Sequence, residues 1–360
     1  MKILLISYGD MDYDGRLRSL YNVFSEMGTV CSFTRGKKAP NKDSRVYNKS
    51  YRKFIVESIR FSKSIDGIDW LVLDNRKATI PGLVLKKMIH PSLVIQDCRE
   101  LYLINEVKHF SGKVGCIFEK TMAQKADIVI CANKERAKIM KKEYSLSKVP
   151  LVYENLRKLE YGVQKEIDAA KKRIDGYIHE EEFRIISSSG CSIKRTNDIL
   201  VNNLGKIDKP CRLFLVGDST VDDKERINTI ISDNGLTNVE IMGRLNQTEL
   251  KYLISQCHIG IVNYGQYDTN NKLCASGKLY EFLYEGIPVV TTTNPPLKRI
   301  VDKYKIGAAD DEYYNGINSV IKSYSMYLEN VRVYTENHSI YDNDKKLISD
   351  IEQYKNLMGN

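Results

Sequence analysis

The sequence predicts an α/β protein made of two doubly wound, Rossmann-like domains in tandem. Short apolar runs alternate with helix-like segments along the 360 residues, and the alternation starts again after a highly charged, helix-like stretch at 165–182. The runs are nearly continuous in Val, Ile and Leu and are followed by polar residues, which is typical of parallel strands buried on both faces. We therefore expect one domain at 1–165 and a second at 166–339, each with its own core.

The first domain is expected to hold a parallel sheet with strands at 3–7, 30–34, 70–74, 92–97, 127–133 and 150–155. Ligands of such sheets bind beyond the carboxyl ends of the strands. After the first strand, Gly15 leads into a helix at 16–27, whose bare first amides would suit a phosphate. The glycine pattern of dinucleotide sites is missing, so a dinucleotide is not expected. Asp10, Asp12 and Asp14 have the spacing of a metal-binding motif, but we favour a solvated turn and expect no metal.

The second domain repeats the pattern with strands at 183–189, 212–218, 239–243, 259–264 and 288–293, and with helices between them, such as the one at 246–257. A last helix at about 342–358 carries a stripe of apolar side chains. It therefore has to dock on a domain. The residues of this stripe are Leu347, Ile348, Ile351 and Tyr354.

Composition and targeting signals predict a cytoplasmic protein. No apolar run approaches the roughly twenty residues that span a bilayer, and the N-terminus turns polar too early for a signal peptide. The eight cysteines are widely spaced without a CxxC pair, and most lie in or beside strand-like runs. We expect them to be small core residues in a reducing compartment.

The charge is distributed unevenly along the chain. Residues 1–180 hold 34 Lys and Arg against 22 Asp and Glu, a difference of +12, whereas residues 181–360 hold 21 against 24, a difference of −3. The basic half predicts an anionic partner. No nucleic-acid-binding motif is visible, so nucleic acid is not expected, and the anionic inner face of the cell membrane or a phosphate-bearing acceptor is favoured. The alternative is a surface bias that serves only solubility.

One segment of this basic half is a candidate for such a contact. A helix predicted at 51–63 has an apolar stripe of Tyr51, Phe54, Ile55 and Ile59 beside the cations Arg52, Lys53, Arg60 and Lys63. This pattern fits a helix lying at a membrane interface. Packing of the stripe onto the sheet is the favoured alternative, since every surface helix of a Rossmann domain has an apolar face.

The most informative stretch is 276–292, SGKLYEFLYEGIPVVTT, which predicts a polar loop, a short helix, a stop and a buried strand. Its helix ends where Gly286 permits a left-handed cap and Pro288 prevents continuation. Lys278 and Glu281 stand three apart on the polar face, so both can reach one ligand beside the free amides of the first turn. A phosphate and a sugar hydroxyl would suit this end. An ordinary exposed Lys/Glu pair is the alternative.

This stretch resembles the nucleotide-sugar site of GT-B glycosyltransferases, in particular retaining enzymes of bacterial polysaccharide assembly. The shared residues are Lys278, Leu279, Tyr280, Glu281, Gly286, Pro288, Val289 and Val290. The resemblance implies that Glu281 binds the ribose hydroxyls and that Ser276, Gly277 and Lys278 lie near the diphosphate. Many relatives carry a further glutamate where this chain has Leu273, which leaves the donor sugar open.

Other segments add residues to the implied site. Gly190, Lys194 and Arg195 are similar to the loop of the family whose cations neutralise the donor diphosphate. Arg244, after the strand at 239–243, would lie near the base or ribose, with a plain surface position as the alternative. Arg99 stands after the fourth strand and would approach the donor sugar, unless it pairs locally with Asp97 or Glu100. Arg195, Lys278 and Arg99 are expected to act in catalysis.

The resemblance implies the GT-B fold, with an interdomain cleft and with the C-terminal helix, 340–360, packing back on the first domain. It also implies a metal-independent, retaining hexosyltransferase without a further cofactor, which moves a sugar from a nucleotide sugar to a glycan or lipid-linked acceptor in cell-surface polysaccharide synthesis. Two alternatives stay open. One is a nucleotide-sugar epimerase of the same fold, and the other is a scaffold that binds the nucleotide sugar without turnover.

Overall fold

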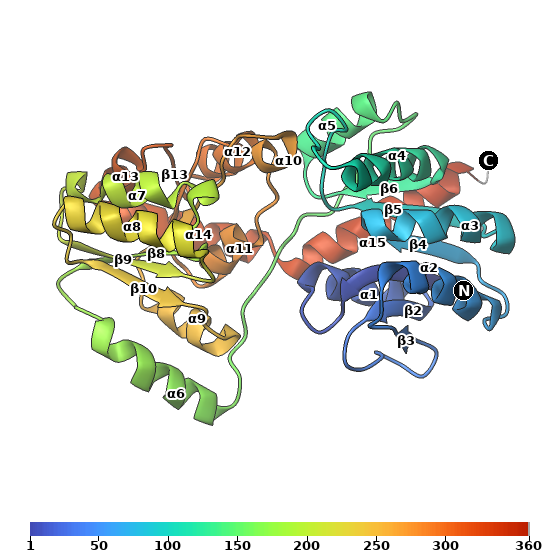
Figure 1. The fold of residues 1–360 in the computed structure, drawn as a ribbon, viewed down its shortest axis with the longest axis horizontal. Coiled ribbons are helices and arrows are strands. Elements are labelled where there is room, and N and C mark those ends of the chain that lie inside the picture. Colours follow the sequence, from blue (N-terminus) through green and yellow to red (C-terminus); the bar gives the residue numbers. More distant parts are fainter. Residues whose placement is uncertain (359–360) are drawn as a thin grey trace. The chain divides into compact units, whose positions relative to one another are not determined.

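The computed structural model describes residues 1–358, which form two units (Figure 1). The first unit contains Met1–Asn155, Asp268–Asn270 and the C-terminal segment from Ile340. The second unit contains Leu156–Tyr267 and Asn271–Ser339. Its start lies before the expected position 166, because Leu159 is already buried in the core of the second unit.

A seven-stranded sheet, parallel throughout, forms the centre of the first unit. Its strand order is β3 (Arg45–Val46), β2 (Thr29–Arg35), β1 (Lys2–Asp10), β4 (Trp70–Asp74), β5 (Leu93–Cys98), β6 (Ile128–Cys131) and β7 (Leu151–Val152). The helices of this unit are α1 (Gly15–Met27), α2 (Tyr51–Lys63), α3 (Thr79–Ile89), α4 (Phe110–Lys125), α5 (Lys134–Glu143) and α15 (Ile340–Met358), with a 3₁₀ turn η1 (Arg76–Ala78).

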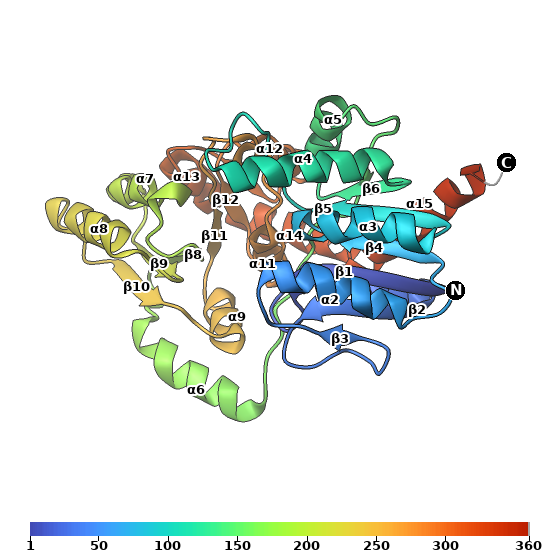
Figure 2. The ribbon, with the colours of Figure 1, turned by 45° about the vertical axis from the view of Figure 1, so that its right-hand side comes forward.

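Helices cover both faces of this sheet because successive strand residues point to opposite sides. On one face, Ile3 and Leu5 of β1 pack with α1 and with Leu347 and Ile351 of α15. On the other face, Leu4 and Ile6 pack with side chains of α2, α3 and α4, and Figure 2 shows these three helices along the sheet. The C-terminal helix therefore returns to the first unit and contacts α1, as predicted.

The second unit has a six-stranded parallel sheet. Its strand order is β10 (Val239–Gly243), β9 (Cys211–Val216), β8 (Phe183–Ser187), β11 (Ile259–Val262), β12 (Val289–Thr291) and β13 (Gly307–Ala309). The helices are α6 (Gln164–Ile174), α7 (Asn197–Asn202), α8 (Val221–Asp233), α9 (Gln247–Ser255), α11 (Gly277–Tyr284), α12 (Pro295–Tyr304), α13 (Tyr314–Lys322) and α14 (Tyr324–Asn337), with 3₁₀ turns η2 (Asp175–Tyr177), η3 (Ile193–Arg195) and η4 (Leu204–Lys206). A short helix, α10 (Thr269–Lys272), begins in the first unit and ends in the second.

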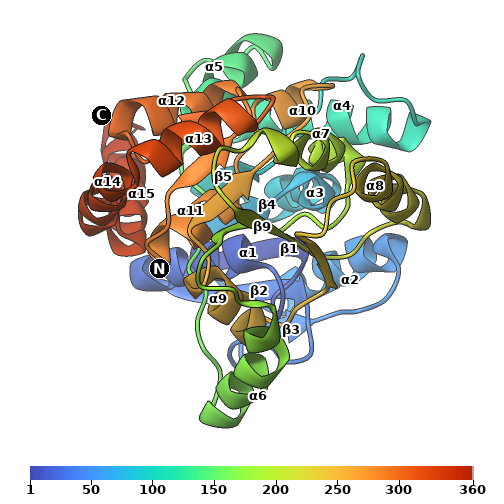
Figure 3. The same ribbon diagram turned by 90° about the vertical axis from the view of Figure 1, so that its left-hand side faces the viewer.

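Two cores flank this second sheet. Residues of α7, α8 and α13 pack on one face, and residues of α9, α11, α12 and α14 pack on the other. The charged stretch predicted to be helical forms α6, which lies against α9 (Figure 3). Two parallel Rossmann-like sheets therefore confirm the predicted fold class.

Two further properties bear on the sequence predictions. All eight cysteines are buried and have free thiols, as expected of core residues. Within residues 1–358, the helices are all too short or too polar to cross a membrane.

Candidate functional site

The candidate site lies where β8 and β11 end, at the centre of the second sheet. These strands are neighbours, with Ile185 opposite Ile259 and Ser187 opposite Ile261. From this pair the strand order runs in opposite directions, through β9 to β10 and through β12 to β13. The loops beyond β8 and β11 therefore separate at their carboxyl ends, and ligands of doubly wound sheets bind at such a point.

Helix α11 starts near the carboxyl ends of these strands, and the packing of its apolar side holds it in place. Leu279, Phe282 and Leu283 are buried in the core of the second unit. At its end, Gly286 has a φ of +81°, and the amides of Gly286 and Ile287 donate to the carbonyls of Leu283 and Phe282 at 2.9 and 3.2 Å. This is a Schellman motif, which confirms the predicted glycine stop.

The first turn of α11 presents polar groups without a side-chain cap. Ser276 holds the N-cap position, but its side chain makes no capping hydrogen bond. The Ser276 hydroxyl is buried and has no hydrogen-bond partner in the structure, and the same is true of the Ser188 hydroxyl after β8. Buried polar groups are normally paired. The uncapped amides and the two hydroxyls therefore offer hydrogen-bonding capacity to a ligand.

Lys278 links the first turn of α11 to the loop after β8. Its ammonium group donates to the backbone carbonyl of Ser188. The pKa of Lys278 is lowered to about 8, mainly by burial and also by the nearby charge of Arg195, whereas Glu281 acts in the opposite direction. An anion bound here would stabilise the protonated amine.

Glu281 is buried, with 4% of its surface exposed. Burial raises the pKa of its carboxyl group, while Arg157 and Lys278 oppose that change. The Arg157 Nε atom lies 2.9 Å from Oε1 of Glu281. Lys278 and Glu281 are therefore not an ordinary exposed pair. Arg157 is absent from the residues predicted from sequence, and its only signal was its position at the junction between the two strand series.

The loop after β8 depends on a glycine. Gly190 has a φ of +60°, and a Cβ atom there would lie 2.4 Å from the carbonyl oxygen of Asp218. Its amide donates to the carbonyl of Val216 at 2.8 Å. The loop after β8 can thus lie directly on the loop after β9, and only glycine fits this approach.

The two cations of this loop differ in their surroundings. The Arg195 guanidinium lies over the ring of Tyr264, 3.8 Å from its centroid. Its charge also acts on Lys278, so the structure brings these two predicted residues together. Lys194 is exposed in the same turn.

A buried polar network, which sequence reasoning missed, holds these loops in place. The Asn197 amide donates to the Ser189 hydroxyl at 3.0 Å and to the Gly190 carbonyl at 2.8 Å. Asn263, after β11, donates to Asn197 Oδ1 at 2.7 Å and accepts from Ser189 at 3.0 Å. Such fully paired networks make a loop rigid.

Arg244 does not join this cluster through any contact in the structure. Its side chain is 76% exposed and lies 3.6 Å from the equally exposed Asp218. This geometry fits the alternative of a plain surface residue.

Arg99 and Gly15 belong to the first unit. Arg99 forms two bonds of 2.5 Å with Asp74 and a further ion pair with Asp14. Asp97 lies 3.7 Å away and is held by a bidentate pair with Arg16 at 2.9 and 2.7 Å. Arg99 is therefore held by ion pairs. Asp97, one of its expected local partners, is among them, but the shorter contacts are with Asp74 and Asp14, which are distant in sequence.

The same cluster changes the expectation for Gly15. Gly15 begins α1 as predicted, but the carboxylate of Asp14 accepts from the amide of Leu17 at 3.1 Å. The amides of this turn are therefore not all bare, because the protein places its own anion on them. The carboxylates of Asp10 and Asp12 accept backbone amides in the same way, as in a solvated turn.

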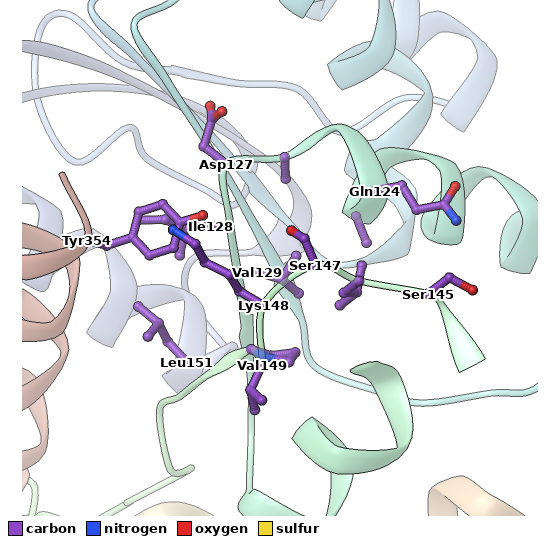
Figure 4. A pocket seen from close by; sticks show the side chains of 14 residues that line it. Gln124, Asp127, Ile128, Val129, Ser145, Ser147, Lys148, Val149, Leu151 and Tyr354 are labelled. Atoms are coloured by element: carbon purple, nitrogen blue, oxygen red, sulfur yellow. The ribbon is translucent and has the colours of Figure 1, made fainter. Parts of the chain in front are cut away.

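Two hollows lie elsewhere on the first unit. A pocket of about 170 Å³ is at the amino ends of β6 and β7, where Lys148 lies 3.7 Å from the ring centroid of Tyr354 (Figure 4). A groove of about 500 Å³ along α2 is lined by Tyr47, Lys49, Arg52, Lys53, Val56, Glu57 and Arg60. The pocket is at the wrong end of the strands for a ligand of a doubly wound sheet.

Among residues 1–358, no cluster of three acidic, His or Cys side chains has metal-binding geometry.

Comparison with known proteins gives one curated relative and several similar structures, whereas no family model matches. A teichuronic acid biosynthesis glycosyltransferase of Bacillus subtilis, TuaH, whose assignment is provisional, is 26% identical over 235 residues. This match covers 63% of the chain but only 57% of that relative.

The solved structures match over the full length. HepE of Anabaena, in complex with UDP and glucose, has a TM-score of 0.73 at 14% identity, over 98% of this chain and 100% of that chain. The UDP-GlcNAc 2-epimerase of Neisseria meningitidis, bound to UDP-GlcNAc, has a TM-score of 0.59 at 12% identity, over 98% and 100%. Together with the two Rossmann-like sheets and the returning C-terminal helix, these similarities show that the chain has the GT-B fold.

Proposed function

We propose that this chain is a glycosyltransferase, which moves a sugar from a nucleoside diphosphate donor to a glycan or lipid-linked acceptor in polysaccharide synthesis. The observation that supports this function best is the first turn of α11. Three kinds of group lie there, at the carboxyl ends of the strands of the second sheet: uncapped amides, the buried and unpartnered Ser276 hydroxyl, and the Lys278 amine. These groups suit a diphosphate, and TuaH and HepE point to the same chemistry.

In this proposal the donor diphosphate lies against Gly277 and Lys278, with Arg195 and Lys194 as further cations. Bond cleavage leaves growing charge on the distal phosphate, and fixed cations with helix amides stabilise that charge. Glu281 accepts hydrogen bonds from the ribose hydroxyls, while Arg157 balances its buried charge. These residues make a bound metal unnecessary for neutralising the leaving group.

We also propose that the anomeric configuration is retained, as the resemblance at 278–290 implies. The bond between the anomeric carbon and the phosphate oxygen breaks, and the acceptor hydroxyl oxygen bonds to the same face of the sugar. The acceptor proton passes to the leaving phosphate, so no protein nucleophile is needed. Comparison of the anomeric NMR signals of donor and product tests this stereochemistry.

The acceptor is proposed to be anionic, or to be carried on an anionic membrane face. The groove beside α2 supports this, because Lys49, Arg52 and Lys53 line it and form no ion pair within residues 1–358. Their charges would attract phosphate or carboxylate groups.

The decisive experiment is a calorimetric titration of UDP and UDP-glucose, the ligands suggested by HepE, followed by product analysis with other nucleotide sugars. We expect micromolar binding that Lys278→Ala weakens by about tenfold, the effect of losing one charge-assisted hydrogen bond. Arg226→Ala, on the exposed side of α8, is the control. Conversion of the donor without an acceptor would favour an epimerase. Binding without turnover would favour a scaffold. The presence of Leu273, where many relatives carry a glutamate, would agree with that result.

A further inference from the structure

Arg157 lies beside the buried carboxylate of Glu281, and both residues belong to the second unit. The segment that carries Arg157 is anchored on this unit by two apolar side chains. Leu156 and Leu159, on either side of it, pack in the core that also holds the apolar side of α11. The position of Arg157 relative to α11 therefore follows from packing within the second unit.

The Glu281 carboxylate has an ion pair but an unfilled capacity for hydrogen bonds. Its side chain is 5% exposed, and the Nε atom of Arg157 lies 2.9 Å from its Oε1 atom. Apart from this contact, the carboxylate accepts no hydrogen bond within residues 1–358. Buried charges are normally both paired and hydrogen-bonded. The remaining acceptor sites of Glu281 therefore fit hydroxyl donors of a ligand.

Two cations act on this carboxylate, and they come from different segments. Lys278 stands one turn earlier in α11, and Arg157 comes from the segment before α6. The other elements in closest contact with α11 are β11 and β12, which have no ionisable side chain, and α14, which packs Val331 and Tyr334 into the same core. Burial raises the pKa of Glu281, and Arg157 opposes this change more strongly than Lys278 does. Loss of Arg157 should therefore raise this pKa further.

The half-exposed guanidinium of Arg157 makes no second ion pair within the described chain, so Glu281 is its partner of opposite charge. We propose that Arg157 is a positioning residue of the donor site, which keeps Glu281 in the ionised form that accepts hydrogen bonds from the ribose hydroxyls. The contact with ribose rests on the proposed function. A protonated carboxyl group uses one acceptor site for its own proton and loses its charge, so the nucleotide should then bind less tightly. The alternative is an ordinary ion pair that serves only the fold.

The pH profile of binding separates these two roles. UDP-glucose is the probe, because it lacks the terminal phosphate of UDP, which titrates near about pH 6. As the pH falls from about 7.5 to about 5.5, Arg157→Ala should lose affinity at a higher pH than the wild type, and the two Kd values should differ by about fivefold or more where the gap is widest. Arg157→Lys keeps the charge and should restore most of the affinity. A ratio of Kd values that is the same at every pH would overturn the proposal.

Two further variants control for effects of charge and of direct contact. Lys158→Ala removes an equal charge from the next, exposed residue and should bind UDP-glucose as the wild type does. In a Glu281→Gln background, Arg157→Ala should change the Kd by less than about twofold, since no ionised carboxylate remains to be supported. A further loss of about fivefold in that background would give Arg157 a contact of its own with the nucleotide and would reject the positioning role.

The ionisation of Glu281 can also be measured without a nucleotide. NMR titration of protein labelled with carbon-13 at the glutamate carboxyl groups gives its midpoint, and the absence of one signal from Glu281→Gln assigns it. The midpoint should lie at a higher pH in Arg157→Ala than in the wild type and in Lys158→Ala. Equal midpoints would contradict the inference. If the wild type binds no nucleotide sugar, the proposed function fails, whereas this titration still decides whether Arg157 keeps Glu281 ionised.

Discussion

At the scale of single residues, Glu281 and Lys278 are linked by burial and charge. Each lies in surroundings that disfavour its charged form, and each lessens that cost for the other. Arg157 favours the charge on Glu281 and disfavours that on Lys278. Two measurements follow from this balance.

The first concerns Glu281→Gln, which keeps the shape of the side chain but loses its charge. Charge-assisted hydrogen bonds to ribose hydroxyls contribute roughly 1.5–3 kcal/mol, so the nucleotide Kd should rise by about tenfold or more. Glu225→Gln, exposed on α8, is the control. Calorimetry measures both, and circular dichroism checks the fold. A wild-type Kd in Glu281→Gln would remove this residue from the site.

The second concerns the pH dependence of nucleotide binding. The pKa of Lys278 is lowered to about 8 in the nucleotide-free protein, first by burial and then by Arg195. A diphosphate binds the protonated amine more tightly, so binding should take up protons and should weaken by about tenfold as the pH rises from 7.5 to 9. Lys278→Met should bind weakly and show little change over this range. A flat profile in the wild type would contradict the proposed contact.

At the scale of elements, α2 and α15 both carry an apolar stripe, but the two helices have different expected roles. Helix α2 spans Tyr51–Lys63, the range expected from sequence. Phe54 of its apolar stripe is fully buried, and Tyr51 and Ile59 pack beside it in the core. The alternative of packing onto the sheet therefore holds. The residues of α2 that stay exposed are its four cations and Val56, and the cations could meet an anionic surface.

Vesicle binding by α2 should accordingly be electrostatic. Each cation near an anionic membrane contributes about 1 kcal/mol, and salt screens the attraction. We expect co-sedimentation with anionic vesicles at low salt, loss of binding at high salt, and loss in a variant with Arg52, Lys53, Arg60 and Lys63 changed to Glu. Recovery with neutral vesicles equal to that with anionic ones would reject α2 as the contact and favour a soluble acceptor.

Helix α15 contributes to the core of the first unit. Leu347 and Ile351 are fully buried there, and the Tyr153 hydroxyl donates to Asp344 at 2.6 Å. Leu347→Ala should lower the free energy of unfolding of the first unit by about 2–5 kcal/mol. Glu352→Ala, one turn on and exposed, should change it by less than about 0.5 kcal/mol.

Trp70 is the single tryptophan and is buried in β4, so its fluorescence reports the unfolding of the first unit. Urea titration of the two variants with this probe makes the comparison. A Leu347→Ala midpoint equal to that of Glu352→Ala would show that α15 adds little to this core.

At the scale of the whole molecule, each unit has its own pair of cores. A ligand stabilises the unit that binds it, by about 2.7 kcal/mol at a hundred times its Kd. Saturating UDP should therefore slow hydrogen exchange in β8, β11 and α11 and leave β1 and β4 almost unchanged. Protection confined to the first unit would place the nucleotide there and contradict the site at α11.

Much of the fold was predictable from local patterns. The strand runs from Lys2–Asp10 to Val289–Thr291 were found because buried parallel strands are continuous in apolar residues. Two strands, Arg45–Val46 and Gly307–Ala309, were missed because they do not lie in a run of Val, Ile and Leu. Gly286 and Pro288 also gave the end of α11 correctly, since helix stops depend on the local backbone.

The tertiary structure alone decided which charges and loops meet. Arg99 pairs with Asp74 and Asp14, and Glu281 pairs with Arg157, over sequence distances that no periodicity covers. Periodicity and capping depend on neighbours within a few residues, whereas ion pairs and buried hydrogen bonds depend on which strand ends the sheet order places together. The sequence by itself therefore determined the elements and the chemistry of the α11 turn, and the fold decided the partners.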